Sequence, residues 1–232
     1  MLKIKYFLFI ILISLGSSKT SFAFQDLNIR ETQEQLNKMI STIDHNRDKN
    51  KNIKGSPYIN DVFQVVKLKR FGDKSFTGRY DANLGEMQIK RENDTIALNN
   101  TENFEITFVL SDKTYKTQSY LDSNGIPKRG FFVVLNETDS LAVLKEEVIR
   151  FYEEKPSTNG YDKAKPAEYR RTKDVYYYRQ GKHVSVLPQK RKDFIKLFPE
   201  HSKDLEVFIK KNKINLKEDE DLITLFQYLE TL

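Results

Sequence analysis

The sequence of 232 residues contains no cysteine and no tryptophan. Without cysteine, the chain has no disulfide framework, no thiolate zinc site, no iron–sulfur cluster and no cysteine nucleophile. A lipid attached to an N-terminal cysteine is excluded as well. The 16 phenylalanines and 12 tyrosines, within a hydrophobic content of 38%, are too many for a wholly disordered chain. These absences and abundances together indicate a globular protein that is stabilised by packing.

The common catalytic motifs are also missing. No HExxH zinc motif, GxSxG nucleophile turn, SxxK pair or GxGxxG phosphate loop occurs, and the nine glycines are scattered. The three histidines, His45, His183 and His201, lack the spacing of a helical metal site. The acidic run 218–221 lacks the alternation and central glycine of a calcium loop, and it suits the first turn of a helix. We therefore assign no catalytic residue, no metal ligand and no cofactor, and the binding residues stay unknown.

The one long apolar run stands at the N-terminus. Lys3 and Lys5 precede an apolar segment over residues 6–15, and Ser21–Ala23 supplies small residues where a signal peptidase reads. The segment is shorter than the roughly 20 residues that span a bilayer. The pattern predicts a signal peptide over residues 1–23 and a mature chain without a transmembrane segment. A membrane anchor is the competing interpretation.

Removal of the leader changes the charge balance. The chain has 39 basic and 33 acidic residues, and loss of Lys3, Lys5 and Lys19 leaves 36 basic residues, which lowers the net charge from +6 to +3. The remaining charge is uneven, because residues 163–217 hold 16 basic and 6 acidic residues. The acidic segment 218–232 can neutralise part of that basic stretch. An exported protein with this balance is not expected to bind nucleic acid.

Residues 24–54 are predicted to form a helix-prone arm followed by a polar linker. Thr32 and Gln35 have the form of a capping box. Residues 44–54 have almost no apolar content, which is typical of a linker. Between them, four apolar residues share one helical stripe: Leu36, Met39, Ile40 and Ile43.

From residue 62 onward, short runs rich in β-branched and aromatic residues alternate with turn residues. Asn, Asp and Gly in these turns tolerate the backbone angles of tight hairpins. The spacing leaves no room for crossover helices, so an antiparallel meander is expected rather than a parallel sheet. The predicted strands cover residues 62–71, 76–81, 86–91, 95–99, 104–110, 114–121, 130–136 and 140–151.

The remainder of the chain is predicted to contain a long loop over 153–171, a hairpin over 174–187 and three short amphipathic helices within 190–232. Ser202 and Asn215 are candidate caps for the second and third helices. The fold class is therefore mainly β (α+β). We expect an antiparallel meander that forms a barrel-like or sandwich sheet, with three short C-terminal helices. Residues 55–232 are expected to form a single domain.

Aromatic residues give the most specific indication of a binding surface. In Val175–Arg179, strand alternation places Tyr176 and Tyr178 on one face, and Tyr177 on the other with Val175 and Arg179. An exposed face of tyrosine and arginine is typical of an interface. The alternative is that the tyrosines border a core with their hydroxyl groups in water.

Parts of the chain resemble a group of small exported proteins of Bacteroidetes-type bacteria. The resemblance rests on the opening Gly55–Tyr58, the strand meander, the tyrosine strand Asp174–Arg179, and the ending that runs from Lys210–Lys213 to Asp221–Leu222. It covers most of residues 55–232. It implies a cell-envelope setting and a β-rich fold, and it transfers no site because the group has no assigned activity.

These observations favour an exported, non-enzymatic cell-envelope protein, periplasmic or secreted, that binds another protein or a surface polymer. A β-barrel carrier of a small apolar ligand is a second hypothesis, since eight strands can enclose one. A hydrolase that uses converging carboxylates is a third, because separation in space is invisible in the sequence. The oligomeric state is not predicted.

Overall fold

The computed structural model describes residues 32, 34, 40–41, 53–92, 94–122, 124–157 and 163–232. The predicted leader, most of the predicted arm and residues 44–52 of the linker lie outside the described residues, so these remain predictions. The helical stripe is wrong at Ile40, because Ile40 and Ser41 form a short strand that pairs with residues 97–98. Residues 40–232 form one compact unit.

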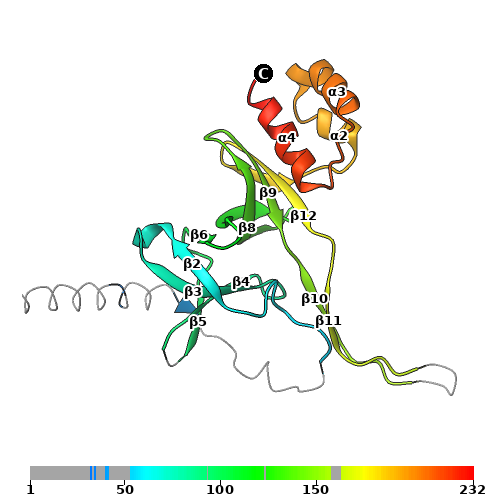
Figure 1. Cartoon of the computed structure of the whole chain (residues 1–232). Coiled ribbons are helices and arrows are strands. Elements are labelled where there is room, and N and C mark those ends of the chain that lie inside the picture. Colours follow the sequence, from blue (N-terminus) through cyan, green and yellow to red (C-terminus); the bar gives the residue numbers. More distant parts are fainter. Residues whose placement is uncertain are drawn as a thin grey trace, which may run out of the picture. The chain divides into compact units, whose positions relative to one another are not determined.

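The fold is mostly β, as predicted, and is built on one large antiparallel sheet (Figure 1). The strand order is β1-β5-β4-β3-β2-β6-β7-β8-β9-β12-β13, and most neighbours in the sheet are consecutive in the chain. This order is that of a meander in which three pairs of neighbours are not consecutive: β1-β5, β2-β6 and β9-β12. The strands of this sheet are β1 (Ile40–Ser41), β2 (Gln64–Leu68), β3 (Ser75–Asp81), β4 (Glu86–Lys90), β5 (Thr95–Leu98), β6 (Glu105–Phe108), β7 (Lys113–Leu121), β8 (Pro127–Glu137), β9 (Leu141–Glu146), β12 (Val175–Gln180) and β13 (His183–Val186).

The sheet is curled in its second half, which supports the barrel-like form of the prediction. Strand β13 lies beside β7, although the two are not paired within the described part of the sheet. The inner face of this curl is filled by Phe132, Leu144, Tyr177 and Val184, with Tyr120 packed edge-on against two of the rings. Packed aromatic side chains therefore occupy the space where an apolar ligand would have to lie.

Three short helices cover the outer face of the same strands (Figure 1). They are α2 (Arg191–Ile195), α3 (Ser202–Lys211) and α4 (Asp219–Leu229), with the 3-10 turn η3 (Pro199–His201) before α3. Their apolar faces pack on β9 and β12, so that these two strands are buried on both sides. The buried members of this helical core are Val143, Tyr176, Leu187, Phe194, Phe198, Leu205, Ile209, Leu216, Leu222, Leu225, Phe226 and Leu229.

The strand predicted over 140–151 is wrong in extent, because the chain leaves the main sheet at Glu147. Beyond this point β10 (Ile149–Tyr152) pairs with β11 (Glu168–Arg171) to form a separate two-stranded ribbon (Figure 1). The loop predicted over 153–171 is therefore also wrong, since β11 lies inside it. The prolines and the lack of apolar alternation in this segment predict a loop. An exposed ribbon packs neither face on a core, so its sequence does not need to alternate between apolar and polar residues.

The helix caps and one strand end also differ from the predictions. Ser202 is the first residue of α3, and its side chain makes no capping hydrogen bond. Asn215 precedes the N-cap of α4, which is Glu218. The strand predicted over 62–71 ends at Leu68, after which Lys69–Phe71 form the 3-10 turn η2. These boundaries depend on tertiary contacts that a local pattern does not contain.

Candidate functional site

The predicted tyrosine surface is not exposed. Tyr176 and Tyr177 are only 7% and 4% exposed, and they lie in the cores on opposite faces of β12. Tyr178 is half-buried against the helical core. In β3, Tyr80 is likewise buried, while Arg79 packs over the ring of Tyr58 at 3.5 Å. The tyrosines therefore belong to the cores, as the alternative interpretation held, but the hydroxyl groups of Tyr176 and Tyr177 donate to Asp219 and Glu146 instead of lying in water.

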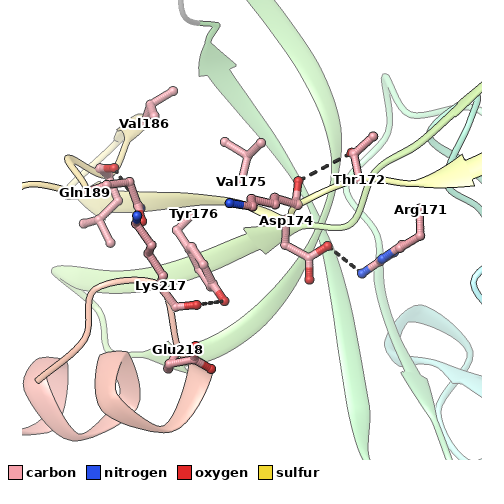
Figure 2. A pocket seen from close by; sticks show the side chains of 11 residues that line it. Arg171, Thr172, Asp174, Val175, Tyr176, Val186, Gln189, Lys217 and Glu218 are labelled. Atoms are coloured by element: carbon pink, nitrogen blue, oxygen red, sulfur yellow. Dashed lines mark hydrogen bonds and ion pairs between the residues drawn. The ribbon is translucent and has the colours of Figure 1, made fainter.

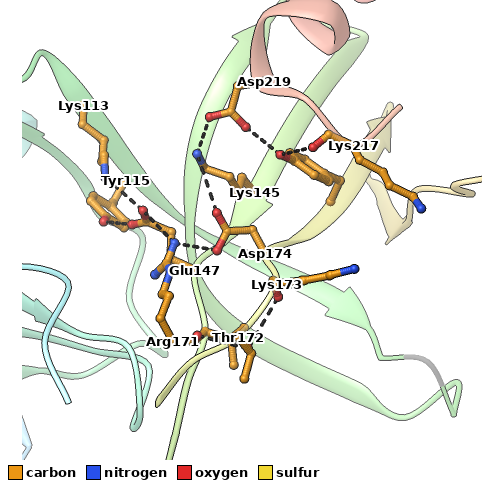
Figure 3. A network of polar contacts seen from close by, with 12 residues as sticks. Lys113, Tyr115, Lys145, Glu147, Arg171, Thr172, Lys173, Asp174, Lys217 and Asp219 are labelled. Atoms are coloured by element: carbon orange, nitrogen blue, oxygen red, sulfur yellow. Dashed lines mark hydrogen bonds and ion pairs between the residues drawn. The ribbon is translucent and has the colours of Figure 1, made fainter. Parts of the chain in front are cut away.

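A junction network of polar side chains lies where the ribbon leaves the main sheet (Figure 3). Its centre is Glu147, whose side chain is 4% exposed. One carboxylate oxygen accepts hydrogen bonds from Lys113 at 3.0 Å and Arg171 at 3.4 Å, and the other accepts one from the Tyr115 hydroxyl. Burial alone would raise the pKa of Glu147, but these donors outweigh it and hold the pKa below its usual value. Glu147 is therefore a buried, ionised anchor.

The same network attaches α4 to the sheet (Figure 3). Lys145 of β9 pairs with Asp219 in the first turn of α4, and it lies 4.0 Å from Asp174. The Tyr176 hydroxyl donates to Asp219 at 2.8 Å and lies 3.1 Å from the Lys217 carbonyl oxygen. Asp219 thus does more than complement the helix dipole, which was its predicted role.

A hollow of about 590 Å³ lies beside this network (Figure 2). Asp174 lines it, and burial raises the pKa of this carboxyl group although Arg171 and Lys145 oppose the shift. Arg171 contacts Asp174 at 2.5 Å. Because cations hold Asp174, Glu147 and Asp219, these carboxylates have structural partners in place of a reacting group.

The histidines do not come together in the described residues. His183 begins β13 and is exposed, whereas His201 ends η3 and His45 lies outside the described residues. Among the residues that the structure describes, no group of three or more potential ligand side chains could hold a metal ion.

A second polar region, the seam groove, lies where the curled sheet does not close, near β7 and β13. Three adjoining hollows of about 770, 500 and 570 Å³ form it, and neighbouring hollows share lining residues. Strand β6 pairs with β7 as far as Lys116, and the Thr117 N–H still donates to the Phe104 carbonyl oxygen at 3.1 Å. Beyond Thr117, β7 has no paired strand on this edge within the described residues and lies beside β13. The seam groove is lined from residues 68–70, 103–105, 116–121, 127–129, 137–139, 179 and 181–185.

The lining of the seam groove is positively charged. Two acidic residues, Glu105 and Glu137, pair with Lys116, which lies between them. Burial would lower the pKa of Lys116, but these two carboxylates outweigh it, so Lys116 remains a cation. Arg70 and Lys128 also have acidic partners just outside the lining, Glu102 at 3.4 Å and Asp122 at 2.8 Å. With these two partners counted, the excess is two positive charges, from seven cations and three acids in the lining itself: Lys69, Arg70, Lys116, Lys128, Arg129, Arg179 and Lys182 against Glu105, Glu137 and Asp139.

Two of the arginines are fixed mainly by neutral acceptors. Arg129 donates to the Asn100 carbonyl oxygen at 2.6 Å and to the Ser119 hydroxyl at 2.9 Å. Arg179 donates to the carbonyl oxygens of Asp139 and Gly181, at 2.9 and 3.0 Å, and also to Glu137. Carbonyl groups hold a guanidinium group in place without cancelling its charge. Arg129 therefore adds positive potential to a rigid groove wall, whereas Glu137 neutralises part of the charge of Arg179.

Other groups in the seam groove are free to bind. The side chains of Gln118, Lys182, His183 and Ser185 have no partner within the described ranges. The groove thus offers an amide, an ammonium group, an imidazole and a hydroxyl group along one open surface. Sequence analysis missed this combination, because its residues come from separate strands and no motif connects them.

Comparisons with known proteins identify no relative of the chain. No protein-family model matches the chain, no curated protein matches it, and no solved structure matches it. No helix within the described residues combines the length and the apolar character that crossing a membrane requires.

Proposed function

We propose that the chain is an exported, non-enzymatic cell-envelope protein that binds an acidic surface polysaccharide in the seam groove. The observation that carries the proposal is the groove itself, an open channel with an excess of positive charge and with hydrogen-bonding side chains that have no partner within the described residues. The N-terminal leader pattern and the resemblance to exported proteins support the setting.

The chemistry of the groove suits an acidic glycan better than a folded protein. The central part of a protein interface is typically apolar and aromatic. Here the hollow that contains Gln118, Arg129 and Lys182 is lined mainly by polar and charged groups. Amide and hydroxyl groups bind sugar hydroxyls, and fixed cations attract carboxylate or sulfate groups. Three adjoining hollows also accommodate successive units of a chain.

This function is tested by measuring how tightly polygalacturonate binds to the protein. The protein is purified after export by the expression host. Lys182→Glu reverses an exposed, unpaired charge in the groove, so we expect roughly tenfold weaker binding, about 1.4 kcal/mol. Lys203→Glu is the matched control, because it makes the same charge change on α3, outside the groove lining, and binding should stay nearly unchanged. Dextran, which is neutral, should bind poorly.

Two results would reject the proposal. Equal loss of binding in the Lys182 and Lys203 variants would mean that the polymer senses only net charge. No binding of polygalacturonate at low salt, where screening is weakest, would remove the acidic glycan as a ligand. The non-enzymatic part is tested separately by the length of the polymer after incubation, which should not change.

A further inference from the structure

The ribbon formed by β10 and β11 is exposed and longer than its regular strands. Phe151 and Tyr152 are 41% and 40% exposed. Beyond the regular strands, Lys155 and Lys165 form a further bridge in the same antiparallel register. A two-stranded ribbon that is open on both faces has little to stabilise it in water. A partner strand would stabilise it.

Like charges face each other across the ribbon at two positions. Arg150 is paired with Arg170, and Lys155 with Lys165. Directly opposed like charges destabilise a strand pair. Arg170 contacts Glu168, whereas the side chains of Arg150 and the two lysines have no partner in the part of the chain described here. An anionic partner would relieve this repulsion.

One edge of β10 is open for backbone pairing. The Ile149 N–H donates to the Ala82 carbonyl oxygen at 3.2 Å, so it points away from β11. By strand alternation, the backbone N–H and C=O groups of Phe151 point to the same side. The Asn83 side chain binds the Ile149 carbonyl oxygen at 3.2 Å, and no described residue pairs with this edge farther along.

The opposite edge of the ribbon, along β11, is already paired with another segment of the chain. Within the described residues, the edge of β10 is therefore the one that a partner strand can reach. Lys54 donates its N–H to the Ala167 carbonyl oxygen at 2.9 Å and accepts from the Tyr169 N–H at 2.8 Å. The ring of Tyr169 lies 5.1 Å from that of Phe151 on one face of the ribbon. The open edge therefore joins an exposed aromatic face to a face that carries Arg150.

We propose that the free edge of β10 binds an extended acidic segment of a partner protein by strand addition. An added strand would bond to the Phe151 backbone, place apolar side chains beside the Phe151 ring, and place acidic side chains beside Arg150. A second copy of this ribbon is a poor partner, because it would bring a second Arg150 and Lys155 to the contact. This inference does not depend on the seam groove.

The probe is a short blocked peptide in which glutamate alternates with valine and threonine. Its binding to the exported protein is measured by fluorescence anisotropy. Arg150→Glu should weaken binding roughly tenfold or more, and the fold should survive because Arg150 is exposed and faces Arg170. Lys203→Glu, the matched charge change on α3, should leave peptide binding unchanged. Arg150→Glu should also leave polygalacturonate binding unchanged, which separates this inference from the proposed function.

The same peptide with alternate backbone nitrogens methylated keeps its side chains and loses its donors on one edge. Its binding should be lost if the peptide adds as a strand. Retained binding would overturn strand addition. Equal binding of a lysine-containing peptide would overturn the requirement for acidic residues. Binding of phosphatidylglycerol vesicles that Arg150→Glu abolishes, with no binding of the acidic peptide, would overturn the proposal in favour of a lipid surface.

Discussion

Strands β9 and β10 follow each other in the chain and have opposite environments. In β9, Ala142, Val143 and Leu144 are completely buried, because the inner core lies on one side and the helical core on the other. In β10, Phe151 and Tyr152 remain about two-fifths exposed. Both segments have residues that favour strands. The difference teaches that position in the fold, rather than strand propensity, decides which aromatic residues are available to a partner.

The two regions also differ in how their charged side chains are paired. At the junction network, each buried or half-buried charge has an opposite charge beside it, as Lys145 has Asp219. On the ribbon, Arg150 faces Arg170 and Lys155 faces Lys165. We infer that paired charges hold the body together and that unbalanced charges serve recognition. The predictions below test this division, beginning with the largest expected effect.

Phe226→Ala should lower the free energy of unfolding by about 3 kcal/mol, because Phe226 is fully buried where α4 packs on the sheet. Urea denaturation measures the change. Val207→Ala is the control on α3, since Val207 is 64% exposed and should have almost no effect. A loss below about half a kcal/mol for Phe226→Ala would mean that the helices are peripheral.

Glu147→Gln should lower the free energy of unfolding by about 2 kcal/mol, because it removes the buried charge that Lys113 and Arg171 neutralise. The native pKa of Glu147 lies below its usual value, so its stabilising contribution is present above the unfolded-state pKa and is lost as the pH falls through the native pKa. Denaturation between pH 7 and pH 3 should therefore show a shallower acid loss in the variant. Parallel pH profiles for the two proteins would contradict this role.

Gly55→Ala should loosen the base of the ribbon and cost about 1.5 kcal/mol. Gly55 has φ +78°, and a Cβ atom there would lie 2.4 Å from the Tyr169 carbonyl oxygen. Hydrogen exchange at the Tyr169 amide should become faster, since that amide donates to Lys54. Exchange at amides of β9 should not change. Unchanged protection at Tyr169 would show that the 53–55 segment does not hold the ribbon.

Phe151→Ser should change the free energy of unfolding by less than about half a kcal/mol, because the ring is exposed and outside both cores. Thermal unfolding measures this, with Phe132→Ser in the inner core as the destabilising comparison. A loss above 1.5 kcal/mol or so for Phe151→Ser would place Phe151 among structural residues rather than binding residues.

Much of the fold could be predicted from the sequence because turns and alternation are local. Turn residues such as Gly181, which has φ +58°, separate the strands at nearly the positions predicted. The three C-terminal helices follow from their apolar stripes. The leader and most of the arm lie outside the described residues and stay predictions. The second sheet was missed, since a ribbon without a core face has no periodic signal.

The site could not be predicted, because it depends on contacts between distant segments. Tyrosine is a residue type that is common at interfaces, and only the curl of the sheet shows that Tyr177 is buried. Gln118 and Lys182 become neighbours across the seam groove although 64 positions separate them. Of the seven cations in the groove lining, only Arg179 and Lys182 belong to the basic stretch 163–217, so the uneven charge of the sequence does not locate the groove.

The most direct test of the account is an NMR titration of the ¹⁵N-labelled protein with oligogalacturonate. The account predicts that the amide signals of the seam groove, including Gln118, Lys182 and Ser185, shift with ligand concentration. Signals of α4 and of the ribbon should stay in place. Shifts confined to the ribbon or the helices, or spread over the whole surface, would contradict a binding site in the seam groove.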